Sequence, residues 1–148
     1  GTDYGYVGDI VDVDPSPVID VLEQGYIPVV STVAQGIDAE TNYNINADTA
    51  ACKRAVALKA KKLILLTDVR GLMLDPDDET TLLTNLKVSE VPKLMRDGVI
   101  KGGMVPKVDC CVEAVRKGVE AANIQDGRVK HSILIELLSK VGVGTMFQ

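Results

Sequence analysis

The chain has 148 residues, of which 46% are hydrophobic and 25% are charged, and its formal net charge is -5. These proportions are those of a globular domain with a core of its own. The 16 basic residues are scattered along an acidic chain that has one Phe, four Tyr and no Trp. Nucleic acid is therefore not expected as the main partner. No apolar run approaches the roughly 18 residues of a membrane span.

Cysteine and histidine show no metal-binding pattern. The chain has an odd number of cysteines, Cys52, Cys110 and Cys111, and their spacing is not that of metal ligands. The single histidine, His131, has no potential ligand beside it in the sequence. We expect no resident metal and reduced, partly buried thiols in a reducing compartment. His131 is expected to be a cap or a surface residue at a helix start.

The first third of the chain mixes short apolar runs with turn signals. Residues 4–13 alternate like a strand or hairpin, and residues 14–25 predict a helix that Gly25 ends. Residues 27–30 are typical of a short buried strand, and residues 35–42 of a polar loop. A helix is predicted over residues 47–59.

From residue 63 onward, strand-like runs alternate with amphipathic stretches. The predicted elements are strand 63–66, an acidic turn at 75–79, helices 89–97 and 104–117, strand 121–125, helix 132–140 closed by Gly142, and strand 143–147. This alternation predicts a layered α/β fold with a mainly parallel sheet, whose ligands gather at the carboxyl ends of the strands.

Tyr43-Asn44-Ile45-Asn46-Ala47-Asp48 places two amides and a carboxylate at alternate positions, where a loop gives way to a helix. Asn44 and Asn46 can donate and accept hydrogen bonds, and Asp48 can hold a cation. The helix start itself favours an anionic ligand. Alternatively, Asn46 caps the helix and Asp48 favours its first turn, which leaves Asn44 unexplained. The residues alone leave both interpretations open.

A second group follows the strand predicted at 63–66. Thr67 and Asp68 come directly after it, so their side chains are expected to face the crevice. Asp68 could accept hydrogen bonds from a ribose, and Gly71 lets the backbone approach a ligand closely. Taken alone, the segment favours the alternative of an ordinary strand-ending turn.

A third group precedes the helix predicted at 104–117. Gly102 and Gly103 lead into a first turn that contains Pro106 and Lys107. Lys107 lies at the positive end of the helix dipole, a placement that becomes favourable if a polyanion lies in front of it. Glycine amides, helix start and lysine predict a phosphate cradle, although the spacing is not that of a Walker loop. The alternative is a flexible turn with a solvated lysine.

These three segments, in this order, resemble the amino acid kinase family and, within it, the acetylglutamate kinases. The matching segments are Asn44–Asp48 (N-x-N-A-D), Leu65–Gly71, Gly102–Val108 (G-G-M-x-P-K-V), Asp126–Arg128, His131–Ser132, Glu136 and Gly142–Thr145. The resemblance covers essentially the whole chain. It implies a layered αβα sandwich with a mainly parallel sheet, as in carbamate and amino acid kinases.

The resemblance also implies ATP-dependent phosphorylation of the side-chain carboxylate of N-acetyl-L-glutamate, a step of arginine biosynthesis. Asn44 matches a residue that binds the acetylglutamate, and Asn46 lines the same pocket. Asp48 matches the residue that holds the catalytic lysines, and Lys107 matches the lysine that stabilises the transferring phosphoryl group. Phosphoryl transfer depends on such positioning and charge neutralisation. ATP is the implied cofactor, and Mg²⁺ accompanies it.

Further site residues are implied by the same resemblance. The ATP-binding residues are Thr67, Asp68, Val69, Arg70, Gly71, Leu72, Met73, Val99, Ile100, Lys101, Gly103 and Met104. Glu136 and Gly142 match the arginine-inhibitor pocket of arginine-sensitive members, in which the counterpart of Asn123 is often a histidine. Cys110-Cys111 resembles photosynthetic forms, which also bind a PII-type nitrogen-signalling protein.

The N-terminal half of the family carries a second essential lysine, a glycine-rich loop for the reacting phosphate and an arginine for the acetylglutamate carboxylate. None of these matches a segment here. We therefore expect residues 1–13 to be the end of an N-terminal acetylglutamate-binding lobe, as a hairpin, and residues 14–148 to be the ATP-binding C-terminal domain. Alone, the chain is expected to bind ATP weakly and to lack useful kinase activity. The intact enzyme is expected to be a homo-oligomer.

Other functions stay open on the sequence. The nearest is another family member, such as a uridylate, aspartate or glutamate 5-kinase, which the double Asn before Asp48 disfavours. A non-catalytic nucleotide- or effector-binding module is the alternative from another class. A dinucleotide-binding oxidoreductase is disfavoured because no G-x-G-x-x-G follows a strand. The expected location is the cytoplasm, or the plastid stroma for a photosynthetic eukaryote.

Overall fold

A computed structural model describes residues 5–139 and 142–148 of the chain. The helices are α1 (Ser16–Glu23), α2 (Ala47–Ala57), α3 (Val91–Arg96), α4 (Met104–Arg116), α5 (Ser132–Leu138) and the short 3-10 helix η1 (Glu79–Thr81). The strands are β1 (Val33–Gln35), β2 (Asn42–Asn44), β3 (Lys62–Thr67), β4 (Asn85–Leu86), β5 (Ala121–Asp126) and β6 (Gly144–Phe147). Among the described residues, no helix has the length and apolar character needed to cross a bilayer.

Four strands form the central sheet, in the order β3-β5-β6-β4. β3 pairs in parallel with β5, from Lys62 opposite Ala121 to Thr67 opposite Asp126, and β4 pairs in parallel with β6. β5 and β6 run antiparallel, so two of the three pairings are parallel. The predicted mixed α/β fold with a mainly parallel sheet is confirmed.

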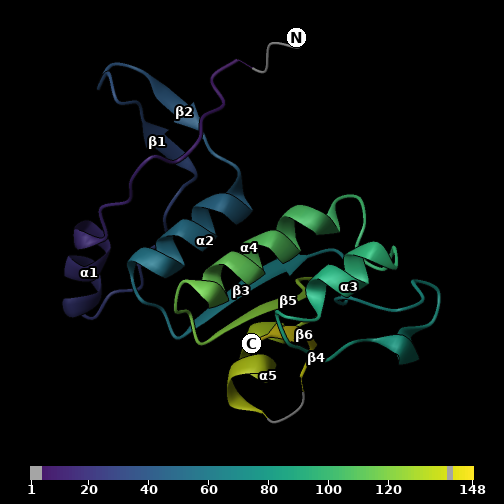
Figure 1. Ribbon diagram of the computed structural model, residues 1–148. Coiled ribbons are helices and arrows are strands. Elements are labelled where there is room, and N and C mark those ends of the chain that lie inside the picture. The colour runs from purple at the N-terminus through teal and green to yellow at the C-terminus, as the bar shows by residue number, and fades with distance from the viewer. Residues whose placement is uncertain (1–4, 140–141) are drawn as a thin grey trace.

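The helices lie on both faces of this sheet. α2 and α4 lie side by side over one face, and α5 lies against the other (Figure 1). Strand β5 shows the division between them. Its Ala122 and Ile124 are buried in the apolar core together with Val108 of α4, whereas Asn123 hydrogen-bonds to Glu136 of α5. Alternate residues of β5 therefore point to the apolar face under α4 and to the polar face next to α5.

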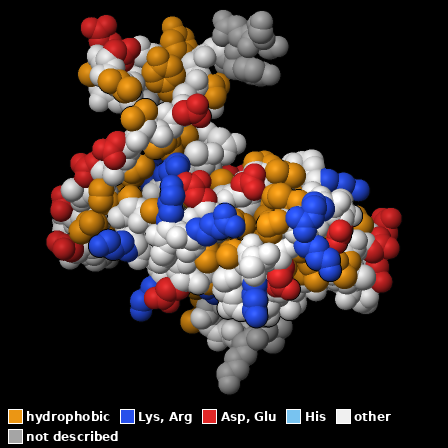
Figure 2. Space-filling view, in the orientation of Figure 1, with side chains coloured by type: hydrophobic (Ala, Val, Ile, Leu, Met, Phe, Trp, Pro, Cys, Tyr) orange, Lys and Arg blue, Asp and Glu red, His pale blue; other side chains and the backbone are white. Residues whose placement is uncertain are grey.

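The N-terminal region projects from this body. β1 and β2 form an antiparallel hairpin, and α1 lies to one side of α2 (Figure 1). Helix α1 contains no buried residue. Apolar side chains are exposed on the hairpin, among them Val33 and Ile37 (Figure 2). Several large apolar side chains of this region are therefore left largely uncovered by the rest of the described chain.

Two strand predictions for this region are wrong. Residues 27–30 form no strand, and Ile27 and Val29 are 89% and 96% exposed. An apolar strand needs a neighbouring strand or helix to cover it, and the described residues leave Ile27 and Val29 almost uncovered. Residues 5–13 form no hairpin; Val7 makes a single bridge to Asn44, and Tyr4 lies outside the described residues.

The remaining predicted helices and longer strands are confirmed, with ends shifted by one or two residues. The helix predicted at 132–140 ends at Leu138, and Lys140 lies outside the described residues. The loop predicted at 35–42 is shorter, because β1 and β2 take its two ends. Strand β4 has two residues, too few for a periodic pattern to show in the sequence.

Candidate functional site

The start of α2 has a conventional cap. The Oδ1 atom of Asn46 accepts a hydrogen bond from the Thr49 N–H at 3.1 Å, and the Thr49 hydroxyl donates to the same atom. Asp48 lies in the first turn. One free amide of the helix start is thus satisfied from within the chain, which explains Asn46 without a ligand. Asn44 lies exposed in β2, where its N–H donates to the Tyr6 carbonyl.

The start of α4 has no such cap. Gly103 occupies the cap position, so no side chain bonds to the first amides. Gly102 has a φ of +57°, and a Cβ added to either glycine would meet no atom within 4 Å. The Met104 and Val105 N–H groups donate to the Lys101 and Gly102 carbonyls at 3.3 and 3.2 Å. What the start of α4 offers is therefore the open space at its two glycines and the positive end of its dipole. An anion fits this position.

An ion pair joins the two helix starts. The Nζ atom of Lys107 lies 2.8 Å from Oδ2 and 3.1 Å from Oδ1 of Asp48. The side chains are 23% and 19% exposed, so the pair is partly shielded from water. The dipole of α4 disfavours Lys107, and Asp48 compensates for this. The contact also fixes the lysine ammonium beside the open start of α4.

The loop after β3 begins with exposed polar groups. The Thr67 hydroxyl donates to Asp68 Oδ1 at 3.2 Å, which is the local contact of an ordinary strand-ending turn. The Arg70 guanidinium lies 3.2 Å from Glu79 Oε2, and both side chains are exposed. Asp68 and Arg70 are therefore accessible to a ligand, and their contact with a nucleotide stays a prediction.

The same loop is then fixed in the core at Leu72, which is 2% exposed. The Leu72 N–H donates to Thr145 Oγ1 at 2.8 Å, and the Leu72 carbonyl accepts from the Leu83 N–H at 2.8 Å. Ile100 is likewise buried, whereas Lys101 is exposed. The side chains of Leu72 and Ile100 therefore pack in the core beneath the predicted nucleotide-binding segments and are not accessible to a nucleotide.

The other predicted nucleotide residues divide by accessibility. Val69, Met73, Val99 and Met104 are partly buried, whereas Gly103 is exposed. A nucleotide could reach these residues through their backbone or through one edge of the side chain.

Asp126 and Arg128 form a charged pair at the same end of the sheet. The family resemblance includes this segment but implies no site role for it. Nε and Nη2 of Arg128 donate to Oδ1 and Oδ2 of Asp126 at 3.0 and 2.9 Å. These bonds hold the pKa of Asp126 below its ordinary value and raise the pKa of Arg128. Asp126 ends β5 opposite Thr67, and this position at a carboxyl strand end is the signal that could have found it.

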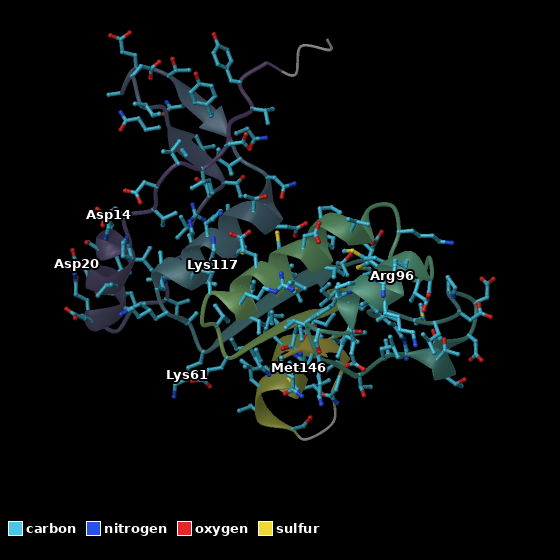
Figure 3. All side chains as sticks on the ribbon, viewed as in Figure 1. Asp14, Asp20, Lys61, Arg96, Lys117 and Met146 are labelled. Carbon is cyan, nitrogen blue, oxygen red and sulfur yellow. The ribbon has the colours of Figure 1, made fainter. Side chains whose placement is uncertain are left out.

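The other face of the sheet holds a second polar group. Glu136 Oε1 accepts from Lys62 Nζ at 2.8 Å and from Asn123 Nδ2 at 2.9 Å. The Glu136 side chain is only 6% exposed, and the buried Oδ1 of Asn123 has no hydrogen-bond partner among the described residues. These side chains, with Gly142 and Met146, line a cavity of about 430 Å³ (Figure 3 labels Met146).

A second cavity, of about 590 Å³, lies between residues 8–12 and the β1–β2 hairpin. Asp9, Asp12 and Asp38 give it an acidic lining. Asp38 is already bonded within the chain, because its Oδ1 accepts from the backbone amides at positions 40 and 41. Asn44 and Asn46 do not line this cavity. The two predicted substrate residues are therefore not part of the lining of this cavity.

The three thiols lie one helical turn beyond the ion pair. Cys52 follows Asp48 on α2, and Cys111 follows Lys107 on α4. Cys52 Sγ donates to the Cys110 carbonyl at 3.3 Å. Burial raises the pKa of the Cys111 thiol. The prediction of free, packed thiols is confirmed, and His131 is an exposed residue at the start of α5, as predicted.

Comparison with protein families gives a match that spans both helix starts. The model of the Amino acid kinase family matches residues 1–126. The chain belongs to the amino acid kinase family. The match includes Asp48, the loop after β3 and Lys107, and it ends at Asp126, the last residue of β5.

The similar curated proteins are acetylglutamate kinases. That of Clostridium beijerinckii is 58% identical over 144 residues, which are 97% of this chain and 50% of the relative. That of Clostridium kluyveri is 54% identical over 146 residues, or 99% of this chain and 51% of the relative. That of Synechococcus sp. is 52% identical over 142 residues, or 96% and 48%. The chain spans about half the length of the curated relatives it matches.

Solved structures share the fold. N-acetylglutamate synthase from Neisseria gonorrhoeae, complexed with coenzyme A and L-arginine, superposes with a TM-score of 0.87 at 28% identity, over 99% of this chain and 33% of that one. Carbamate kinase from Giardia lamblia bound to AMP-PNP superposes with a TM-score of 0.68 at 22% identity, over 93% of this chain and 45% of that one. The carbamate kinase likeness is evidence of the fold alone.

Proposed function

We propose that this chain is the ATP-binding C-terminal half of an acetylglutamate kinase, which transfers a phosphoryl group from ATP to the side-chain carboxylate of N-acetyl-L-glutamate. The observation that carries the proposal is the ion pair of Asp48 and Lys107 beside the uncapped start of α4. The acetylglutamate kinases at 54–58% identity support the choice of substrate.

The phosphate end of the proposed site is built from α4. Lys107 supplies positive charge for the phosphoryl oxygens, and Gly102 and Gly103 leave room for them in front of the helix dipole. Asp48 holds Lys107 in position. Among the described residues, no group of three acidic, His or Cys side chains could hold a metal ion, so Mg²⁺ is proposed to arrive on the nucleotide phosphates.

The nucleoside end is proposed to lie along the loop after β3. The exposed Asp68 carboxylate can accept hydrogen bonds from ribose hydroxyls, and Arg70 and Lys101 offer donors from the surface. Asp68 and Arg70 follow the carboxyl end of β3, a parallel strand, where ligands of open α/β sheets bind.

The acetylglutamate end is only partly present. Asn44 and Asn46 are both exposed just before α2, and the Nδ2 group of Asn46 can donate to a carboxylate while its Oδ1 serves the cap. We propose that the other half of the enzyme supplies the second lysine, the glycine-rich loop and the arginine. The exposed apolar Ile27 and Val29 support a further polypeptide segment packing on this side. The chain alone is then a weak ATP binder without turnover.

Calorimetric titration with MgATP tests the nucleotide site. We expect saturable binding by the wild type and at least about tenfold weaker binding by Lys107→Ala, because a charge-assisted contact is lost. Lys117→Ala is the matched control, since Lys117 lies at the other end of α4 (Figure 3). Equal affinities for wild type and Lys107→Ala would contradict the proposed phosphate position.

Reconstitution tests the reaction. The chain is mixed with a separately produced N-terminal half of the Clostridium beijerinckii enzyme, and ADP formation is followed with N-acetyl-L-glutamate, L-glutamate, L-aspartate and UMP. We expect turnover only in the mixture and only with N-acetyl-L-glutamate. Turnover by the chain alone at the rate of an intact kinase would contradict the half-enzyme proposal. No turnover in a mixture that forms a complex would favour a non-catalytic module.

A second proposal concerns the cavity on the α5 side of the sheet, which we propose binds arginine as an inhibitor. Guanidinium and ammonium groups need acceptors, and the buried Glu136 carboxylate and the unpartnered Asn123 Oδ1 provide them. The similar synthase was solved with L-arginine, which supports this choice of ligand. Titration with L-arginine is expected to give heat that Glu136→Gln abolishes and Glu113→Gln does not. No heat with the wild type would contradict the proposal.

A further inference from the structure

We propose that Thr145 is a positioning residue for nucleotide binding. Its hydroxyl fixes the loop after β3 at Leu72, so that the exposed Asp68 and Arg70 meet the nucleotide in one conformation. The proposal rests on the proposed function, because it concerns the same nucleotide site. The proposal gives a role to Gly144 and Thr145, which lie in β6 and take no part in the ion pair or in the two helix starts.

The contact is buried and reaches far across the sequence. Thr145 is 0% exposed in β6, opposite Ile124 of β5. Its Oγ1 accepts the Leu72 N–H at 2.8 Å, and the Leu72 carbonyl is bonded to the Leu83 N–H on its other side. The loop is therefore held at one residue by two backbone bonds, one of them to the central sheet.

Two glycines make this contact possible. Gly71 has a φ of +152°, and a Cβ there would lie 2.7 Å from Thr145 Oγ1 and 3.0 Å from the Thr145 amide nitrogen. A Cβ at Gly144 would collide with the Ile124 carbonyl. The loop and β5 thus press closely on the Gly144-Thr145 segment from two sides, which leaves the Thr145 hydroxyl little freedom to turn away.

The residues that would meet the nucleotide have no comparable support. Asp68 receives a local bond from Thr67, and Arg70 pairs with Glu79 on the surface. Without the Thr145 hydroxyl, the Leu72 N–H would be buried without an acceptor unless the loop moved. MgATP would then have to order a mobile loop on binding, which lowers affinity.

Three threonine variants test the proposal in the full chain. Thr145→Val removes the hydroxyl at nearly constant volume, and Thr145→Ser keeps it. Thr81→Val is the matched control, because the Thr81 hydroxyl accepts the Asp75 N–H at 3.0 Å in the acidic turn beyond the loop. MgATP affinity is measured by calorimetry well below each melting temperature, and exchange of the Leu72 amide proton is measured by NMR.

We expect Thr145→Val to bind MgATP about tenfold more weakly and to exchange the Leu72 amide faster. Thr145→Ser and Thr81→Val are expected to match the wild type in both measurements. A folded Thr145→Val with unchanged MgATP affinity would overturn the proposal, as would Thr145→Ser binding no better than Thr145→Val. A folded wild type that binds no MgATP would overturn the proposed function itself and, with it, the role of Thr145.

Discussion

Helices α2 and α4 start side by side, yet their first turns are built for opposite charges. The start of α2 has Asn46 as its cap and the acidic Asp48 in its first turn, whereas that of α4 has an uncapped Gly103 and the basic Lys107. Since every helix start is the positive end of a dipole, Asp48 suits its helix and Lys107 opposes its own. The start of α4 is electrostatically unfavourable in isolation, and it is the one at which we propose that the phosphates bind. Asp48 at the start of α2 holds Lys107 in place.

The largest expected effect comes from placing a negative charge at the uncapped start, with Gly103→Asp. The backbone φ of -64° suits any residue, and a Cβ meets open space, so folding should be retained. Repulsion from the phosphates should weaken MgATP binding at least about tenfold, because like charges about 4 Å apart repel by several kcal/mol near a protein surface. Stability should be unchanged or about 0.3–1 kcal/mol higher, because the charge suits the dipole.

Gly103→Asn is the matched neutral control for this variant, and both are compared by calorimetric titration and thermal melting. It has nearly the same size and should bind MgATP much as the wild type does. If Asn weakened binding as strongly as Asp, size and not charge would be responsible, and the contrast between the two helix starts would lose its electrostatic basis.

The ion pair itself should show an asymmetry that follows from the dipoles. Asp48→Asn leaves Lys107 against the dipole of its helix, whereas Lys107→Met leaves Asp48 in a favourable first turn. Urea unfolding of both single variants and the double variant should give a coupling energy of about 1–2 kcal/mol for this partly buried pair, with the larger single loss for Asp48→Asn. A coupling near zero would mean that the contact does not hold Lys107.

A smaller effect is expected at the capped start. Asn46→Ala removes the acceptor for the Thr49 N–H and should lower the free energy of unfolding by about 1 kcal/mol. Asn46→Ser keeps a capping oxygen and should recover most of the loss. MgATP affinity should be the same for all three proteins, since α2 offers its start to Asn46 and not to phosphate. Weaker MgATP binding by Asn46→Ala would place the anion between both helices.

The sequence predicts the body of the fold better than its N-terminal region, for a physical reason. Strand β3 is an apolar run that pairs with β5, and apolar residues of both strands pack against α2 and α4, so the local pattern and the tertiary context agree. The run at 27–30 has the same pattern, but Val29 is 96% exposed because no described residue covers it. A hydrophobic pattern indicates that a segment would be stabilised by burial. Whether the segment forms a strand depends on which other elements pack against it.

The site shows the same division between local and distant information. The cap of Asn46 can be read from its own segment, since a cap bonds three residues ahead. The partner of Lys107 cannot, because Asp48 lies on another helix, and only the family resemblance pointed to it. The bond from Leu72 to Thr145 spans 73 positions, and no local motif indicates it. Contacts between elements have to be seen in the folded chain.

The smallest expected effect lies farther along the same two helices. Glu113 of α4 bonds to Lys117 at 2.6 Å and to Lys53 of α2 at 2.8 Å, and these two lysines hold the pKa of Glu113 below its ordinary value of 4.5. Because the folded-state pKa is the lower one, the stabilisation is present above pH 4.5 and is lost as the pH falls through the folded-state pKa.

Glu113→Gln tests this, with the free energy of unfolding measured from neutral to acidic pH. The difference between wild type and variant should be small at neutral pH, shrink as the pH drops below 4.5 and diminish in high salt, because Lys117 is exposed and Lys53 is only partly buried. A difference independent of pH would show that packing, and not charge, is lost. In that case, charge would contribute to the contact between α2 and α4 only at the helix starts, where Asp48 and Lys107 are partly shielded from water.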